Sequence, residues 1–190
     1  MTGVADVAVD LGGKRLGLLH ELLPGAVRFA LLVPPGTTSG KSAIAEVESA
    51  ASAIGRQVEI LSASTNLDID AAFASLVQKR ADALLVAPQI LFSTRRVQLV
   101  TLAARHAVPT MYYQREYVEA GGLMSYGSSI IDRERQLGVY TGRILKGEKP
   151  TDLPILRAVK FEFVINLQTA KTIGLEIPPM LLARADEVIE

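Results

Sequence analysis

Short apolar runs alternate along the chain with longer segments whose apolar positions recur every three or four residues. The run Arg28–Val33 is almost continuously apolar, which is typical of a strand buried on both faces of a parallel sheet. Comparable runs begin near residues 57, 82 and 109, a repeat of about 27 residues, which is the length of a βα unit. This half of the chain therefore predicts an α/β fold, an open parallel sheet flanked by helices.

Helices are predicted between these strands from the same periodicity. The first spans about Leu11–Leu23, and the second spans Ser42–Ile54 and ends at Gly55. The third is expected to start at Asp68, which would cap it, and the fourth near Ser93. The side chains expected to point inward are Ile44, Val47, Ala51 and Ile54 in the second helix, Ile69, Phe73, Leu76 and Val77 in the third, and Val97, Val100 and Ala104 in the fourth.

Beyond Gly122 the repeat is lost. Ser129 and Asp132 have the spacing of a capping box and predict a helix that closes at Gly147. Its expected inward residues are Leu137, Tyr140, Ile144 and Leu145. Residues 159–165 alternate between charged and apolar positions, which indicates a strand with one exposed face, and 167–173 predict a short helix ending at Gly174.

The stretch 110–127 lies where the repeating pattern ends. It is rich in tyrosine and contains the adjacent pair Arg115–Glu116 and the turn Gly121–Gly122 between two apolar runs. A polar, aromatic-rich segment at the junction of two architectures is typical of a cleft or a hinge. The alternative is an interior strand followed by an ordinary surface loop.

Composition excludes several kinds of site. The 20 basic and 20 acidic residues cancel, which argues against a nucleic-acid or anionic-membrane surface. The chain has no cysteine, so disulfides, thiolate metal sites and cysteine nucleophiles are excluded. His20 and His106 are interpreted as helix-surface residues, and no cofactor is predicted. No signal peptide or apolar window of membrane-spanning length is encoded, so the chain as written would be cytoplasmic.

One segment imitates a phosphate-binding loop. Gly40-Lys41-Ser42 follows a strand and precedes a helix, but Pro35 stands where the first glycine of that motif belongs. Proline lacks the N–H group and fixes φ, which disfavours the tight loop. No dinucleotide fingerprint and no nucleophile with a histidine base is present, so we predict no enzyme activity. A flavodoxin-like phosphate- or nucleotide-binding enzyme or switch that uses Gly36–Ser42 remains the alternative.

Several segments, in this order, carry a resemblance to a known family. They are Lys14–Pro24, Gly121–Gly127, Gly142–Pro154, Ile165–Pro178 and Arg184–Glu190. Together they resemble the substrate-binding proteins of ABC transporters, specifically the tryptophan- and tyrosine-type uptake binders. The likeness covers essentially the whole chain.

The resemblance implies a type I periplasmic-binding-protein fold, in which two α/β lobes joined by hinge strands close on a small solute. It also implies that this chain is shortened at its start, with one complete lobe and part of the other. Residues 1–124 would then be the second lobe, 125–154 a return segment of the first lobe, and 155–190 the crossover back and the tail.

The resemblance also implies function without catalysis: recognition of a small-molecule solute, such as an aromatic amino acid or related carboxylate, for an ABC permease. Its expected location is periplasmic. Tyr113 and Tyr126 would stack on the ligand, Arg115 would hold a carboxylate and Glu116 an amino group, unless Arg115 and Glu116 form a hinge salt bridge. A homodimer would bury apolar surface left by the missing lobe, including Leu137, Tyr140 and Ile144. The full set of expected ligand-binding residues is Thr37, Thr38, Ser64, Gln89, Tyr113, Arg115, Glu116, Ser125, Tyr126 and Ser128.

Overall fold

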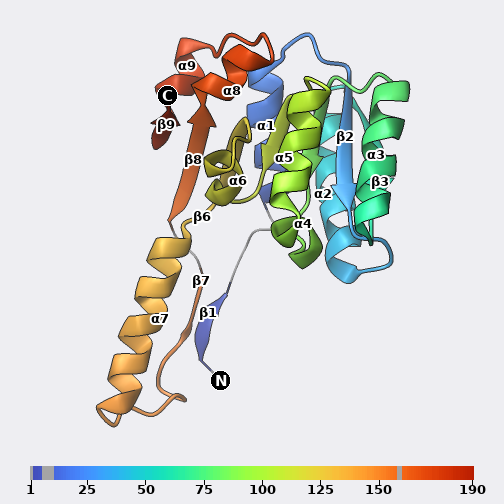
Figure 1. Cartoon of the computed structure of the whole chain (residues 1–190). Coiled ribbons are helices and arrows are strands. Elements are labelled where there is room, and N and C mark those ends of the chain that lie inside the picture. The colour runs from blue at the N-terminus through green and yellow to red at the C-terminus, as the bar shows by residue number, and fades with distance from the viewer. Residues whose placement is uncertain (1, 6–10, 158–159) are drawn as a thin grey trace.

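A computed structural model describes residues 2–5, 11–157 and 160–190 of the chain. Most of them form one body around a seven-stranded sheet with strand order β3-β2-β4-β5-β6-β8-β9, from which a smaller extension projects (Figure 1). The expected α/β sheet is therefore confirmed, and it has three strands more than the four that the sequence repeat predicts.

The body begins with α1 and continues through the predicted βα repeat. Its elements up to β6 are α1 (Gly12–Leu22), β2 (Arg28–Val33), α2 (Thr38–Ala53), β3 (Gln57–Ser62), α3 (Asn66–Gln78), β4 (Ala83–Val86), α4 (Ile90–Thr94), α5 (Arg96–Arg105), β5 (Thr110–Tyr112), α6 (Arg115–Glu119) and β6 (Met124–Ser128). Strands β3, β2, β4, β5 and β6 are mutually parallel, as βα connections require.

Each face of the sheet carries its own apolar core. One face packs against α1 and α2, with Leu16, Leu19 and Val47 among the buried side chains. The other face packs against α3, α5 and α6, where Phe73 and Tyr117 are buried. Burial on both faces explains why β2 and β4 are apolar at nearly every position.

The chain leaves the body after β6 and later returns to it. The extension consists of α7 (Ile130–Leu145), β7 (Ile155–Arg157) and β1 (Gly3–Ala5), in which β1 pairs with β7 in a parallel two-stranded sheet. The returning strand β8 (Phe161–Asn166) is antiparallel to β6, and α8 (Leu167–Thr172), α9 (Pro179–Leu182) and β9 (Glu187–Ile189) complete the body. Of the strand predicted at 159–165, residue 159 lies outside the described residues. Residues 3–5, which the sequence grouped with 1–124, belong to the extension.

Several local predictions were wrong. Thr65 caps α3, and Asp68 is the third residue of the helix, where its side chain completes a capping box with Thr65. The predicted fourth helix is two helices, α4 and α5, and Val97 is exposed because Leu99, Leu102 and Ala103 face the core instead. Exposed side chains that were expected inward also include Ile54, Val77 and Leu145. Apolar periodicity predicts that a segment is helical more reliably than it predicts which face of the helix the neighbouring elements will bury.

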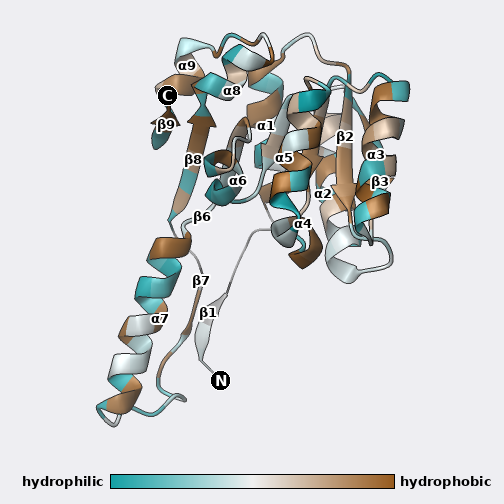
Figure 2. Ribbon diagram, viewed as in Figure 1, coloured by the Kyte–Doolittle hydropathy of each residue, from teal (hydrophilic) through white to brown (hydrophobic). Residues whose placement is uncertain are grey.

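The small size of the extension explains why Leu145 in α7 is exposed although it was expected to point inward. Tyr140 is buried, and its hydroxyl donates to the carbonyl of Pro154, whereas Leu145 is 82% exposed. Figure 2 shows apolar residues along α7 on a helix that stands away from the body. A two-stranded sheet covers only one side of the helix that packs on it, so part of the apolar surface of α7 faces solvent.

Candidate ligand-binding edge and hinge network

Strands β2 to β6 all end at one edge of the sheet, and the extension leaves from this same edge (Figure 1). We call it the carboxyl edge: the segments 34–38, 63–65, 87–93 and 113–116, together with Ser128 at the end of β6. In open α/β sheets, ligands bind outside the carboxyl ends of the strands. Most of the residues expected to bind ligand lie there, because they follow strands that the sequence placed correctly.

A hydrogen-bonded polar cluster lies between the ends of β4 and β5. The Tyr113 hydroxyl donates to the Gln89 carbonyl at 2.9 Å and lies 2.7 Å from the Ser93 hydroxyl. The Ser93 hydroxyl also lies 3.5 Å from Gln114 Oε1, and Tyr117 donates to the Tyr113 hydroxyl at 3.1 Å. The backbone and hydroxyl contacts fix this cluster, while the side chains of Gln89 and Gln114 remain partly exposed. Ser93 was not among the predicted site residues.

The tyrosines are placed differently from the expected stacking arrangement. The ring of Tyr113 is only 3% exposed and packs 5.3 Å from that of Tyr117, so it has no open face for a ligand. Burial also raises the pKa of the Tyr117 phenol, which keeps it a neutral donor. Tyr126 is partly exposed and stacks on Phe161, with ring centroids 6.0 Å apart. Tyr113 therefore supports the carboxyl edge from below and does not present its ring to a ligand.

Thr37 and Ser64 are engaged in helix caps. Thr37 Oγ1 accepts from the N–H of Gly40, and Ser64 Oγ donates to Asp68 Oδ2. Hydrogen bonds from the backbone N–H and hydroxyl of Ser64 lower the pKa of Asp68, which keeps this cap charged. Thr38, the first residue of α2, is exposed. All three residues lie at the carboxyl edge.

The phosphate-loop look-alike does not have the geometry of a phosphate loop. Helix α2 already begins at Thr38, so Gly40 and Lys41 lie within its first turn. Their N–H groups donate to Thr37 Oγ1 and to the Thr37 carbonyl. Backbone N–H groups that are used for the cap are not available to surround a phosphate.

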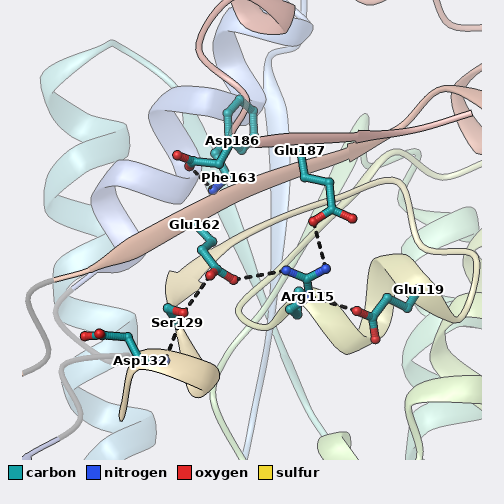
Figure 3. Close-up of polar contacts among 8 residues, drawn as sticks. All are labelled: Arg115, Glu119, Ser129, Asp132, Glu162, Phe163, Asp186 and Glu187. Carbon is teal, nitrogen blue, oxygen red and sulfur yellow. Dashed lines mark hydrogen bonds and ion pairs between the residues drawn. The ribbon is translucent and has the colours of Figure 1, made fainter. Parts of the chain in front are cut away.

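Arg115 binds three carboxylates that come from separate elements (Figure 3). Its Nε lies 2.8 Å from Glu119 Oε1 in α6, one terminal nitrogen lies 2.8 Å from Glu187 in β9, and the other lies 3.4 Å from Glu162 in β8. The hydrogen bond that Arg115 donates to Glu119, together with its hydrogen bond to Glu187 and the charge of that carboxylate, raises the pKa of Arg115. Glu116 is not among these partners, and its Oε2 is buried without a hydrogen bond. The ion pairs of Arg115 thus form with Glu119 on its own helix and with the distant Glu162 and Glu187, and not with Glu116.

Glu162 links this ion cluster to the extension. While one of its oxygens faces Arg115, the other accepts from Ser129 Oγ at 2.6 Å. Ser129 caps α7 by accepting from the N–H of Asp132, as its spacing predicted. We call Arg115, Glu119, Glu162, Glu187 and Ser129 the hinge network, because they join α6, β8 and β9 to the first turn of α7 (Figure 3).

The two remaining residues predicted on the hinge side, Ser125 and Ser128, differ in their exposure. Ser125 is 1% exposed, so it is not accessible to a ligand from this edge, whereas Ser128 is partly exposed.

A shallow hollow of about 270 Å³ lies beside the hinge network, between Arg115, Lys160 and Asp186. A larger hollow of about 480 Å³ lies at the opposite end of the sheet, near Arg28 and Arg56. In the described part of the chain, no group of three or more acidic or histidine side chains could hold a metal ion.

A family model described as ABC transporter substrate binding protein matches residues 1–189. The chain belongs to the ABC transporter substrate-binding protein family. Sequence comparison with curated proteins gave no significant match. Within 2–5, 11–157 and 160–190, no helix combines the length and apolarity needed to cross a lipid bilayer.

Solved structures confirm the type I periplasmic-binding-protein fold. A conserved domain protein from Vibrio cholerae has a TM-score of 0.86 and 24% identity, with 98% of this chain and 62% of that chain covered. The ABC domain in complex with L-Trp from Streptococcus pneumoniae has a TM-score of 0.82 and 23% identity, with 99% and 64% covered. A ligand-free, open substrate binding protein with adhesive properties from Clostridium difficile has a TM-score of 0.72 and 23% identity, with 100% and 62% covered. The chain thus spans less than two thirds of the length of each.

Proposed function

We propose that this chain recognises a small solute for an ABC importer and does so without catalysis, with an ABC permease as its partner. The solute is an aromatic amino acid or a related small carboxylate, and the site of action is periplasmic. The body acts as the second lobe, and the extension acts as part of the first. These assignments follow from family membership and from the arrangement of the carboxyl edge.

The observation that carries the proposal is the polar cluster between the ends of β4 and β5. Ser93 and Tyr113 hold the backbone of Gln89 in place, and the side-chain amide of Gln114 lies beside them, with its Oε1 3.5 Å from the Ser93 hydroxyl. The partly exposed amide of Gln114 offers N–H donors to a carboxylate at this point of the edge. The exposed hydroxyl groups of Thr38 and Ser64 at the same edge add further polar contacts.

Arg115 contributes indirectly in this proposal. Its guanidinium already lies among three carboxylates, and a ligand carboxylate would have to displace one of them. We therefore assign the carboxylate of the ligand to the amide of Gln114 and assign Arg115 to the hinge. The aromatic character of the ligand rests on the L-Trp bound to the pneumococcal relative and on the partly exposed ring of Tyr126.

The expected affinity is low, because the described residues supply one side of a cleft. Ligand pockets bury about 70–90% of a small ligand, and one lobe offers roughly half of those contacts. The cost of lost translational and rotational freedom remains. If half of an interaction of about 8 kcal/mol is retained, the dissociation constant is on the order of 1 mM.

Titration of the isotope-labelled chain with L-tryptophan, followed by NMR chemical shifts, tests the proposal. We expect saturable shifts at Gln89, Gln114 and Tyr126, with Gln114→Ala weakening binding several-fold. Gln168→Ala serves as the matched control, because Gln168 is an exposed glutamine on α8 at the other end of the sheet.

Two outcomes would contradict this function. The absence of shifts up to about 10 mM for L-tryptophan and other carboxylates would remove the ligand class. A melting shift with ATP that Lys41→Ala abolishes would instead support the phosphate-binding alternative. Micromolar binding of L-tryptophan would overturn the half-cleft argument alone, because it requires a complete pocket.

A further inference from the structure

Arg15 is a buried arginine that reaches from helix α1 to the hinge strand β6. It is 2% exposed, and its Nε donates to the Tyr126 carbonyl at 2.7 Å. Ala87 and Pro88, which follow β4, line the same small cavity as Arg15, so this side chain reaches the carboxyl edge. Burying a charge is costly unless hydrogen bonds compensate it, so a guanidinium at this position is expected to hold a defined geometry.

The Tyr126 carbonyl points away from β8, as the pairing of the two strands requires. In an antiparallel pair, every second residue exchanges its backbone hydrogen bonds with the neighbouring strand. Leu123 and Ser129 bond toward β8, through the N–H of Asn166 and the carbonyl of Lys160. Tyr126 lies three residues from each of them and so takes the alternate position. Its N–H and carbonyl therefore face the β5 side of the sheet.

Strand β5 ends before it reaches this carbonyl. Among the described residues, its pairing with β6 stops where Tyr112 lies opposite Ser125. The donor that a longer strand would supply comes instead from the side chain of Arg15. Hydrogen bonds from a guanidinium are shorter and stronger than those from a neutral amide. The contact thus fixes the backbone of β6 at the point where the strand leaves the body.

Tyr126 also carries the partly exposed ring of the proposed ligand site. This ring stacks on Phe161, with centroids 6.0 Å apart, and lies edge-to-face with Phe163 at 6.5 Å. Both of these contacts come from β8, on one side of β6, whereas Arg15 holds the Tyr126 backbone from the other side. The direction of the ring therefore depends on both.

We propose that Arg15 is a positioning residue for the recognition of aromatic solutes. By holding the Tyr126 carbonyl, it sets the direction in which the Tyr126 ring meets the ligand. The inference rests on the proposed function, because it requires an aromatic ligand at the carboxyl edge. It adds to that function a role for α1 in the choice between aromatic and aliphatic solutes. The contact that we assign to Gln114, with the ligand carboxylate, does not depend on Arg15.

A double-mutant cycle with L-tryptophan distinguishes positioning from a general effect on stability. Arg15→Met removes the donor but keeps a long apolar stem, and it should raise the dissociation constant about threefold or more. Tyr126→Ala should also weaken binding. In the Tyr126→Ala background, Arg15→Met should change the dissociation constant by less than about twofold, because no ring is left to direct. Equal losses in both backgrounds would overturn the proposal.

The conservative variant gives a further test of the same contact. Arg15→Lys keeps a charged donor but not the planar guanidinium, so it should weaken L-tryptophan binding less than Arg15→Met does. Circular dichroism would show whether each variant folds, and Arg15→Lys replaces Arg15→Met in the cycle if the latter does not. Arg105→Met is the matched control, because Arg105 is an exposed arginine at the end of α5.

NMR of the ligand-free chain separates this inference from the proposed function. The carbonyl ¹³C resonance of Tyr126 should shift in Arg15→Met and remain unchanged in Arg105→Met. If the parent chain binds L-tryptophan and this resonance does not move in Arg15→Met, the role of Arg15 is overturned while the proposed function stands. A parent chain that fails to bind L-tryptophan or any other aromatic carboxylate would contradict the proposed function, and this inference with it.

Discussion

Gly127 shows how strongly a single residue can constrain this edge of the sheet. In β6 it passes the loop that follows β5, and a Cβ atom at this position would lie 2.0 Å from the carbonyl oxygen of Tyr113. That oxygen belongs to the backbone and cannot rotate away as a side chain would. The polar cluster that includes Tyr113 thus depends on the absence of a side chain at Gly127.

Replacing this residue should therefore be costly. Gly127→Ala must move either β6 or the loop at Tyr113, and we expect a loss of about 2–4 kcal/mol in the free energy of unfolding. Urea denaturation followed by circular dichroism measures it. Gly17→Ala is the control, because Gly17 lies within α1 with nothing near its Cβ position, and alanine there should stabilise by up to about 1 kcal/mol. A Gly127→Ala variant as stable as the parent would contradict the close approach.

At the scale of elements, the hinge network decides how the extension is attached. Arg115 joins α6 to β8 and β9, and Glu162 carries this connection to the cap of α7 through Ser129. The Glu162 side chain is 13% exposed, so it is poorly solvated if its cationic partner is removed. The network thus fixes the start of α7 relative to the sheet.

Removing the cation at this junction should loosen the start of α7. We expect Arg115→Ala to lower the free energy of unfolding by about 1–2 kcal/mol and to speed amide exchange in the first turn of α7. Urea denaturation and hydrogen exchange measure the two effects. Arg135→Ala is the control: this arginine is 67% exposed and pairs with Asp132 on its own helix, so its loss should cost less than about 0.5 kcal/mol. If the two variants behaved alike, the junction would not depend on Arg115.

At the scale of the molecule, the body and the extension differ in how much core they contain. The body has apolar cores on both faces of a seven-stranded sheet. In α7, Tyr140 is the buried residue, and the extension's sheet has two strands. Two-stranded sheets are marginal on their own, because little apolar surface opposes their conformational entropy.

The extension should therefore open before the body does. We expect amides of α7 to exchange at least tenfold faster than those of β2 and β4, which should exchange only on global unfolding. Hydrogen exchange with mass spectrometry, performed at concentrations where the chain is monomeric, measures this difference. Uniform protection of α7 and the central strands would mean that the two parts unfold as one cooperative unit.

The sequence by itself determined the succession of βα units in the body from α1 to β5, although it merged α4 and α5 and missed α6, α9 and β9. Each βα unit is local, so the apolar runs, the helical periodicity and signals such as Gly55 and the Ser129 cap specify it within a few dozen residues. Because parallel strands end at one edge, the sequence also located most of the candidate binding residues there. It could not reveal that Tyr113 is buried, since that depends on Tyr117 and Ser93 packing around it.

Only the tertiary structure decided how the distant parts meet. Arg115 pairs with Glu162 and Glu187, which lie 47 and 72 positions further along the chain, and β1 pairs with β7, so that Gly3 lies opposite Ile155. Such contacts depend on where the whole sheet brings its ends together, and no local pattern encodes them. The same holds for the outer face of α7: its periodicity predicts a helix, but the elements that fold beside it determine which side remains uncovered.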